Sequence, residues 1–397
     1  MIFSFSEQFR ETNIKKQMYL SWMNRMSTKG LQFGYKVHQM KHPDFRPRGI
    51  KQFCRLKKPT ILLLLKEVMK EKFKVMPKER DYRFELLVVL YFFANGCSYR
   101  VLGQSFGIAP SSAADIISRW IPPLKKFAYK QINLLRTRKE LEKISGAFER
   151  RAKVRGFKGC VGLMDGVVFP IKKPQKDQAS YWCQRKHIHG VTTLATVDHK
   201  WRFIHLFIGW PSRAHDTAVL AQDPLWKNAI YPPNNHEWWI LADCGFPNSV
   251  SPIRMITPYK KTANLTQPQK KFNEICRTVR SRNEHVFGLL KKIFRILSGE
   301  TGPLDTKSVR KTNEIILIGC GLHNFRINKD KPDIGREIRD LVSEDGFSEN
   351  LSNGPEGLMN DSYTQPTTSL AAEQFRQRLV NSCNQTNQIG DHMYGII

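Results

Sequence analysis

This 397-residue sequence has few acidic residues, no closely spaced cysteines and no long apolar runs. Its eight cysteines include no Cys-x-x-Cys pair, which argues against a zinc module or a disulfide framework and favours a reducing intracellular compartment. No apolar stretch reaches the roughly 20 residues of a membrane-spanning helix, and the first residues lack a signal-peptide pattern. We therefore expect a soluble intracellular protein that has no membrane partner.

The shortage of acids leaves the chain strongly basic. Lys and Arg total 64 against 35 Asp and Glu, which gives a formal net charge of +29 at pH 7. Solubility needs a much smaller charge, so we expect a polyanionic partner, with nucleic acid favoured over an anionic membrane. The length predicts two or three structural units.

Residues 1–79 are basic and irregular, and we assign no chemistry to them. Lys57-Lys58 and the neighbouring basic residues resemble a nuclear import signal, although such runs also arise by chance in so basic a chain.

Residues 80–127 contain three apolar segments of helix length, separated by Gly96 and Gly107, which predict a small all-α helix-turn-helix domain. In this interpretation Ser98 caps the second helix and Ser111 or Ser112 caps the third, which Pro122-Pro123 ends. We expect the small core of this domain to contain Ile116, Ile117 and Trp120.

The third helix of this domain is the candidate DNA-reading helix. It offers Ser111, Ser112 and Arg119 as DNA-binding residues, but Asp115 would face the phosphates unfavourably. Plain helical packing is the alternative.

Residues 155–328 change to the period of strands and then of a long helix. Apolar runs at 160–171, 190–198, 201–211, 238–245 and 254–260 predict strands, and the second and third of these form a hairpin at His199-Lys200. A helix follows from about Phe272 to Phe294, with apolar positions on one face. This order predicts an α/β catalytic core. Residues 329–397 are polar and aperiodic, so we expect a disordered tail, with a possible helix at Ser369–Val380 as the alternative.

Three acids follow apolar segments or face outward from a helix: Asp165, Asp243 and Glu284. Carboxylates at the ends of adjacent buried strands converge at one edge of a sheet, and hard cations such as Mg²⁺ prefer oxygen ligands. Two such ions can activate a nucleophile and stabilise a leaving oxygen at a phosphodiester. A surface glutamate paired with neighbouring arginines is the alternative for Glu284.

The predicted long helix also carries basic residues on the side of Glu284. At about 100° per residue, the same side holds four candidate phosphate-binding residues: Arg277, Arg280, Lys291 and Arg295.

Several segments between residues 80 and 330 resemble the DDE endonuclease domain of PIF/Harbinger-type transposases. Met164-Asp165-Gly166 matches the segment of the first acid, and GWPSRAHD at 209–216 is the most specific match. Tyr181–Lys186 matches a Tyr-x-x-Arg-Lys segment with one extra residue. ADCGF at 242–246 keeps the second acid among altered neighbours, and EHVFGLLK at 284–291 closely matches the segment of the third.

The resemblance implies a ribonuclease-H-like fold, with Asp165, Asp243 and Glu284 as catalytic metal ligands and Asp216 as an auxiliary ligand. For Asp216, helix capping is the alternative. It also implies Mg²⁺, for which Mn²⁺ can substitute, DNA as substrate, a Myb-like DNA-binding partner protein and a nuclear location, with the cytoplasm also open.

We therefore expect a divalent-metal-dependent DNA nuclease that cuts and joins DNA at the ends of a mobile element. The alternative is a domesticated descendant that no longer transposes and acts through DNA or protein contacts alone. A nuclease for RNA–DNA hybrids fits the segments less well. The terminal repeats, the target sequence and the oligomeric state are not determined by the sequence.

Overall fold

The computed structural model describes residues 50–70, 81–154, 157–233, 237–260, 264–304, 308–345 and 369–385. The chain divides into two compact units, residues 1–123 and 124–397. Most of the basic N-terminal region and much of the tail lie outside the described residues. Within the described residues, no helix is both long and apolar enough to cross a bilayer.

The first unit is helical. It contains α2 (Ile50–Cys54), α3 (Lys58–Met69), α4 (Tyr82–Asn95), α5 (Tyr99–Phe106) and the first part of α6 (Pro110–Gln131). Helix α3 lies where we expected irregular chain. Its buried face, which includes Ile61, Leu64 and Val68, recurs at helical spacing, and Pro59 occupies a favoured first-turn position.

Helices α4, α5 and α6 occupy the three predicted segments. Ser98 caps α5 by accepting a hydrogen bond from the Val101 amide, and Gly107 ends the helix at φ 67°. The predicted core is confirmed, because Ile116, Ile117 and Trp120 are buried. The Trp120 indole donates to Glu85 over 2.7 Å, which satisfies this buried carboxylate.

Two predicted details of α6 are wrong. The helix begins at Pro110, so Ser111 and Ser112 lie in its first turn and not at its cap. It also continues through Pro122-Pro123 to Gln131. Proline removes a helical hydrogen bond and clashes with the preceding turn. Packing offsets this cost, since Trp120, Leu124 and Ala128 on both sides of the prolines are completely buried.

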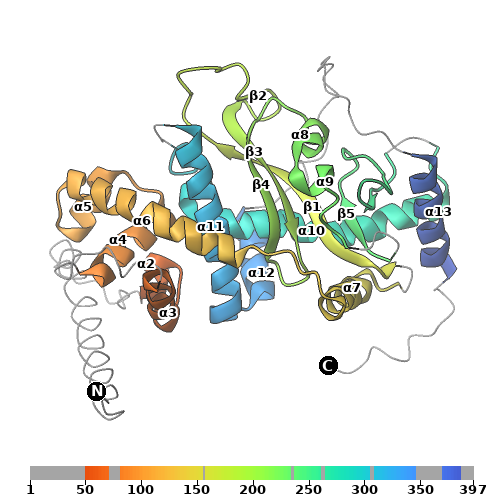
Figure 1. Cartoon of the computed structure of the whole chain (residues 1–397), viewed down its shortest axis with the longest axis horizontal. Coiled ribbons are helices and arrows are strands. Elements are labelled where there is room, and N and C mark those ends of the chain that lie inside the picture. Colours follow the sequence, from red (N-terminus) through yellow and green to blue (C-terminus); the bar gives the residue numbers. More distant parts are fainter. Residues whose placement is uncertain are drawn as a thin grey trace, which may run out of the picture. The chain divides into compact units, whose positions relative to one another are not determined.

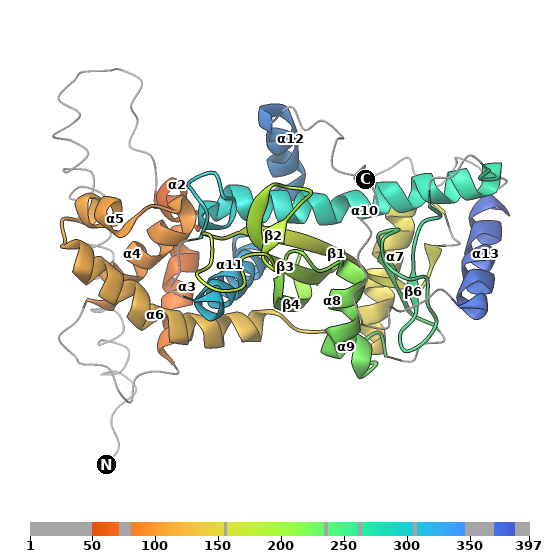
Figure 2. The same ribbon diagram turned by 90° about the horizontal axis from the view of Figure 1, so that it is seen from above.

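The second unit is built on a mixed sheet (Figures 1 and 2). Its strands are β1 (Cys160–Pro170), β2 (Trp182–Cys183), β3 (Ile188–Val197), β4 (Phe203–Pro211), β5 (Trp239–Ala242) and β6 (Met255–Ile256). Strand β3 pairs antiparallel with β1, β2 and β4, which confirms the predicted hairpin. Strand β5 pairs in parallel with β1 and β6. This arrangement is consistent with the expected ribonuclease-H-like core.

Helices surround this sheet. They are α7 (Arg138–Ala152), α8 (Asp216–Gln222), α9 (Pro224–Lys227), α10 (Gln267–Ile293), the 3-10 turn η2 (Arg295–Leu297) and α11 (Val309–Asp330). Helices α7 and α10 pack on β1 and on each other, and α11 packs on β4. Figure 2 shows the long helix α10 running beside the strands. It begins five residues before the predicted start, because Thr266 and Gln269 form a capping box.

The C-terminal region contains two helices where we expected disorder: α12 (Ile334–Asp345) and α13 (Leu370–Gln385). Helix α13 packs against α10 and buries Ala372, Leu379, Val380 and Cys383. The polar composition misled the prediction because α13 needs only one narrow apolar stripe, which a tertiary partner covers. The Ser369–Val380 alternative is therefore confirmed as a helix.

Candidate active site

Strand pairing places Asp165 and Asp243 next to each other. Met164 on β1 pairs with Ala242 on β5, so the following residues, Asp165 and Asp243, occupy neighbouring positions of two parallel strands. Asp165 lies in the middle of β1 and does not end it, contrary to the sequence interpretation. Strand β5 ends at Ala242, and this termination leaves the carboxylates at an edge of the sheet.

Arg280 of α10 reaches both of these carboxylates. Its Nη1 lies 2.8 Å from Asp243 Oδ1, and its Nη2 lies 3.9 Å from Asp165 Oδ2. The Arg280 side chain is only 15% exposed. Arg280 is therefore an internal counter-ion in this structure, whereas the sequence interpretation placed it on an outward, phosphate-binding stripe.

Asp216 joins the same site by close contact with the backbone of Gly166. The capping alternative is wrong, because His215 occupies the cap position and Asp216 is the first residue of α8. A β-carbon at position 166 would lie 2.6 Å from Asp216 Oδ1. The side chain thus both begins a helix and approaches Asp165. The absence of a side chain at Gly166 makes room for it.

The three aspartates share one electrostatic environment. Burial, together with the charges of Asp243 and Asp216, raises the pKa of Asp165 to about 7, although Arg280 opposes the rise. Burial also raises the pKa of Asp216, which Arg185 opposes. A site that concentrates negative charge away from water in this way favours the binding of cations.

Glu284 is exposed on α10, one turn beyond Arg280. Residues four apart on a helix lie on the same side, about 6 Å apart along the axis. Among the described residues, no group of three Asp, Glu, His or Cys side chains lies close enough to hold a metal ion. The structure brings Asp165 and Asp243 together around Arg280, with Asp216 against Gly166 and Glu284 one turn further along α10.

The donor set of this site suits a hard divalent ion. Asp165 and Asp243 offer carboxylate oxygens, which Mg²⁺ and Mn²⁺ prefer, and the Arg280 cation already lies against both. Asp165 and Asp243 would hold the ion, with Glu284 or Asp216 as the further oxygen ligand.

Two lysines, Lys186 and Lys291, lie in this region. Lys291 was predicted to bind DNA, whereas Lys186 was not predicted as a site residue. Lys186 follows β2, and its pKa is lowered by burial and by Arg185, while Asp216 and Asp165 oppose this shift. Burial, together with the charge of Lys186, lowers the pKa of Lys291 on α10 to about 8. The Lys291 ammonium lies 5.6 Å from the centre of the Phe169 ring. The Tyr181–Lys186 segment was the sequence signal for Lys186, but only packing brings it to Lys291.

The remaining candidate DNA-binding residues occupy different surroundings. Arg277 is exposed on α10. Arg295 lies beyond α10 in η2 and pairs with Glu300 over 3.5 Å, so the four basic residues do not form one helical stripe. The stripe required the helix to continue, but α10 ends at Ile293. In the first unit, Arg119 pairs with Glu85 over 2.9 Å.

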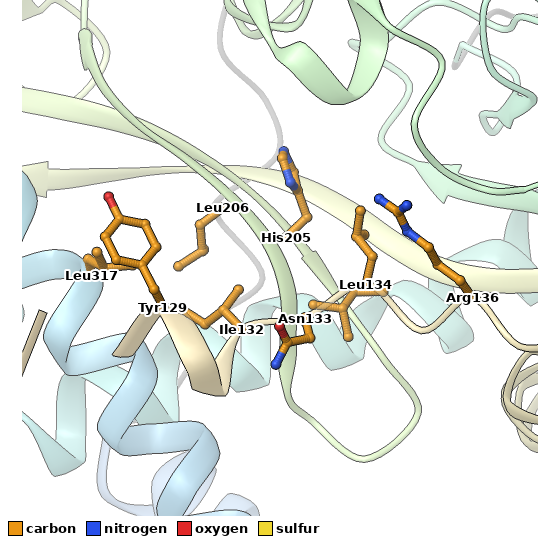
Figure 3. Close-up of a pocket in the computed structure, with 9 residues that line it drawn as sticks. Tyr129, Ile132, Asn133, Leu134, Arg136, His205, Leu206 and Leu317 are labelled. Carbon is orange, nitrogen blue, oxygen red and sulfur yellow. The ribbon is translucent and has the colours of Figure 1, made fainter. Parts of the chain in front are cut away.

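A cavity of about 390 Å³ lies elsewhere in the second unit (Figure 3). Residues of β4, including His205 and Leu206, line it together with Tyr129, Leu134 and Arg136. His205 also pairs with the buried carboxylate of Asp223 over 2.8 Å. None of the acids of the candidate site lines this cavity, so the candidate chemistry lies at the sheet edge and not in this hollow.

Comparison with known proteins gives a consistent result. Residues 164–324 match the family described as DDE superfamily endonuclease, a range that contains Asp165, Asp216, Asp243 and Glu284. An ALP1-like protein of Arabidopsis thaliana is 27% identical over 255 residues, which cover 61% of this chain and 59% of that protein. The match therefore spans less than two thirds of that relative. Antagonist of like heterochromatin protein 1 of Arabidopsis thaliana is 25% identical over 301 residues, 73% of this chain and 70% of that protein. No solved structure matches the chain significantly.

Proposed function

We propose that this chain, whose residues 164–324 match the DDE superfamily endonucleases, cleaves DNA with divalent metal ions held by Asp165, Asp243 and Glu284. The observation that carries the proposal is the pairing of β1 with β5, which sets two carboxylates side by side at a sheet edge. Bound Mg²⁺ or Mn²⁺ supplies an activated nucleophile and a stabilised leaving oxygen.

The protein's own residues have three roles in this proposal. Asp165 and Asp243 position the ion, Glu284 completes its ligands from α10, and Asp216 supports Asp165 from the side of Gly166. Lys186 and Lys291 hold the flanking phosphates, because both are half-buried cations, Lys186 feels the charges of Asp165 and Asp216, and Lys291 feels the charge of Lys186. Arg277 contacts a more distant phosphate from the exposed side of the same helix.

The finer activity we propose is strand transfer at the ends of a PIF/Harbinger-like mobile element, in which a freed 3′ hydroxyl attacks target DNA. A Myb-like partner and a nuclear location belong to the same proposal. It rests on the resemblance of the GWPSRAHD and EHVFGLLK segments. Sequence-specific DNA binding through α4–α6, with Ser111, Ser112 and Arg119, stays a prediction.

A second candidate function is that of a non-transposing descendant that acts through DNA or protein contacts. The name of one relative, antagonist of like heterochromatin protein 1, describes action against another protein and favours this candidate. The acids at the sheet edge favour the nuclease. The two candidates differ in whether metal-dependent cleavage occurs.

A plasmid-nicking assay tests the proposed nuclease. We expect the purified chain to nick plasmid DNA with Mg²⁺ or Mn²⁺ and to stop when a chelator is added. Asp165→Asn, Asp243→Asn and Glu284→Gln should each abolish cleavage, because each keeps its shape and loses a charged metal ligand. Asp216→Asn should reduce metal affinity or stability and keep turnover.

The assay has two informative contrary outcomes. Full activity in one of the three variants would remove that acid from the catalytic set. No metal-dependent nicking by a folded wild-type chain, together with DNA binding, would favour the non-transposing descendant. A strand-transfer assay requires the inverted repeats that flank the coding region, which can be found in the neighbouring DNA.

A further inference from the structure

Arg280 supplies the positive charge between the two carboxylates of the candidate metal site. Its guanidinium is planar and presents several donors, so it can contact Asp243 at 2.8 Å and approach Asp165 at 3.9 Å at once. We propose that Arg280 is an internal cation that competes with the divalent metal for Asp165 and Asp243, so that metal binding displaces it. This inference rests on the proposed metal site.

The competition follows from the surroundings of Arg280. Asp165 and Arg280 are 18% and 15% exposed, so little water screens the charges of this pair, whereas Asp243 is 41% exposed and its contact with Arg280 is screened more. Because the charge-assisted pair is favourable, only a minor fraction of molecules has Arg280 displaced from the carboxylates. The apparent metal affinity is the intrinsic affinity multiplied by this fraction. Arg280 therefore stabilises the fold by neutralising crowded aspartates, and it weakens metal binding for the same reason.

The position of Arg280 on α10 also relates it to Glu284. The two residues are four apart and lie on the same side of the helix, where Glu284 is exposed. When Arg280 leaves Asp243, Glu284 is the acid one turn along that faces the same side. Arg280, which competes with the ion, and Glu284, the proposed third ligand, thus lie on the same helix, α10.

Equilibrium binding of Mn²⁺ to the full-length chain without DNA, at pH 8, tests the inference. Free Mn²⁺ can be followed by electron paramagnetic resonance, and melting temperatures can be measured with and without the ion. We expect Arg280→Gln to bind Mn²⁺ on the order of tenfold more tightly than wild type. Without metal, its melting temperature should fall, and Mn²⁺ should raise it more than in wild type.

Two further variants keep the result interpretable. Arg280→Lys keeps the charge but presents a compact ammonium that cannot span both carboxylates, so its Mn²⁺ affinity should lie between the other two. If Arg280→Gln does not fold, the comparison of Arg280→Lys with wild type still tests the inference. Lys270→Gln removes an exposed cation of the same helix that has no assigned role in metal or DNA binding, and it should leave Mn²⁺ affinity within about twofold of wild type.

Asp165→Asn separates this inference from the proposed function. If Asp165→Asn loses Mn²⁺ binding while the Arg280 variants bind as wild type does, the competition is refuted and the metal site stands. If Asp165→Asn binds Mn²⁺ as tightly as wild type, the proposed metal site itself fails. Weaker DNA binding by Arg280→Gln with unchanged Mn²⁺ affinity would instead make Arg280 a phosphate contact and overturn the inference.

Discussion

At the scale of single residues, the candidate site depends on a position without a side chain. Gly166 follows Asp165 on β1, and an added β-carbon would lie 2.6 to 2.7 Å from all three atoms of the Asp216 carboxyl group. We predict that Gly166→Ala displaces Asp216, weakens Mn²⁺ binding severalfold and destabilises the fold by about 1–3 kcal/mol, as overpacking does. Metal titration and melting curves measure both effects.

Gly146 provides the matched control for Gly166. It lies inside α7, and an added β-carbon there would meet only the Arg150 side chain at 3.5 Å, an ordinary contact. Gly146→Ala should therefore be neutral or stabilise the fold by up to about 1 kcal/mol, since alanine favours helix. Equal behaviour of the two variants would contradict the role given to Gly166.

Arg280 shows what residue-level reasoning could not reach. Its place on the Glu284 side of α10 followed from the helical period. Whether it faces DNA or Asp243 depends on how closely α10 packs against β1 and β5. That distance is a tertiary property, and no local pattern encodes it.

At the scale of elements, α13 is the clearest departure from expectation. Arg376 stacks 3.8 Å over the Tyr259 ring and donates to the carbonyl oxygens of Thr257 and Pro258. The helix therefore fastens the segment after β6 to the N-terminal half of α10, which carries Phe272. Helix α13 is consequently part of the second unit.

We predict that Leu379→Ala in the full chain destabilises the fold by about 2 kcal/mol or more, because it truncates a buried side chain of a helix that packs against α10. Gln374→Ala changes an exposed position of the same helix and should stay within about 0.5 kcal/mol of wild type. Chemical denaturation measures both. An unaffected Leu379→Ala variant would show that α13 does not contribute to the stability of the unit.

The prolines inside α6 are a second departure from expectation at this scale. Pro122-Pro123 predicted a helix end from local chemistry, yet the helix continues to Gln131. The free energy of burying Trp120, Leu124 and Ala128 exceeds the local cost. The rule that proline ends a helix therefore fails where the helix has buried residues on both sides of the proline.

At the scale of the whole molecule, the chain has a net charge of +29, opposite in sign to the charge of nucleic acid. We predict DNA binding with a steep salt dependence, of slope about −5 or steeper in log K against log salt, similar for unrelated duplexes. Arg277→Gln should make the slope shallower by about one, because one phosphate contact is lost. The melting temperature of this variant should not change, since Arg277 is exposed.

Two contrary results are informative for this prediction. A slope that is unchanged in Arg277→Gln would remove that residue from the DNA-binding surface. A strong preference among the unrelated duplexes would indicate base contacts in addition to phosphate contacts.

The sequence by itself determined the basic character, the succession of helices, strands and long helix, and the three acids. These depend on composition, on apolar period and on short motifs, which are local properties of the chain. Tertiary structure decided the rest: the pairing of Met164 with Ala242 set Asp165 beside Asp243, and packing turned Arg280 inward. Packing also covered the apolar stripe of α13. The physical reason is that strand register and helix packing depend on residues far apart in the sequence, which local patterns do not relate.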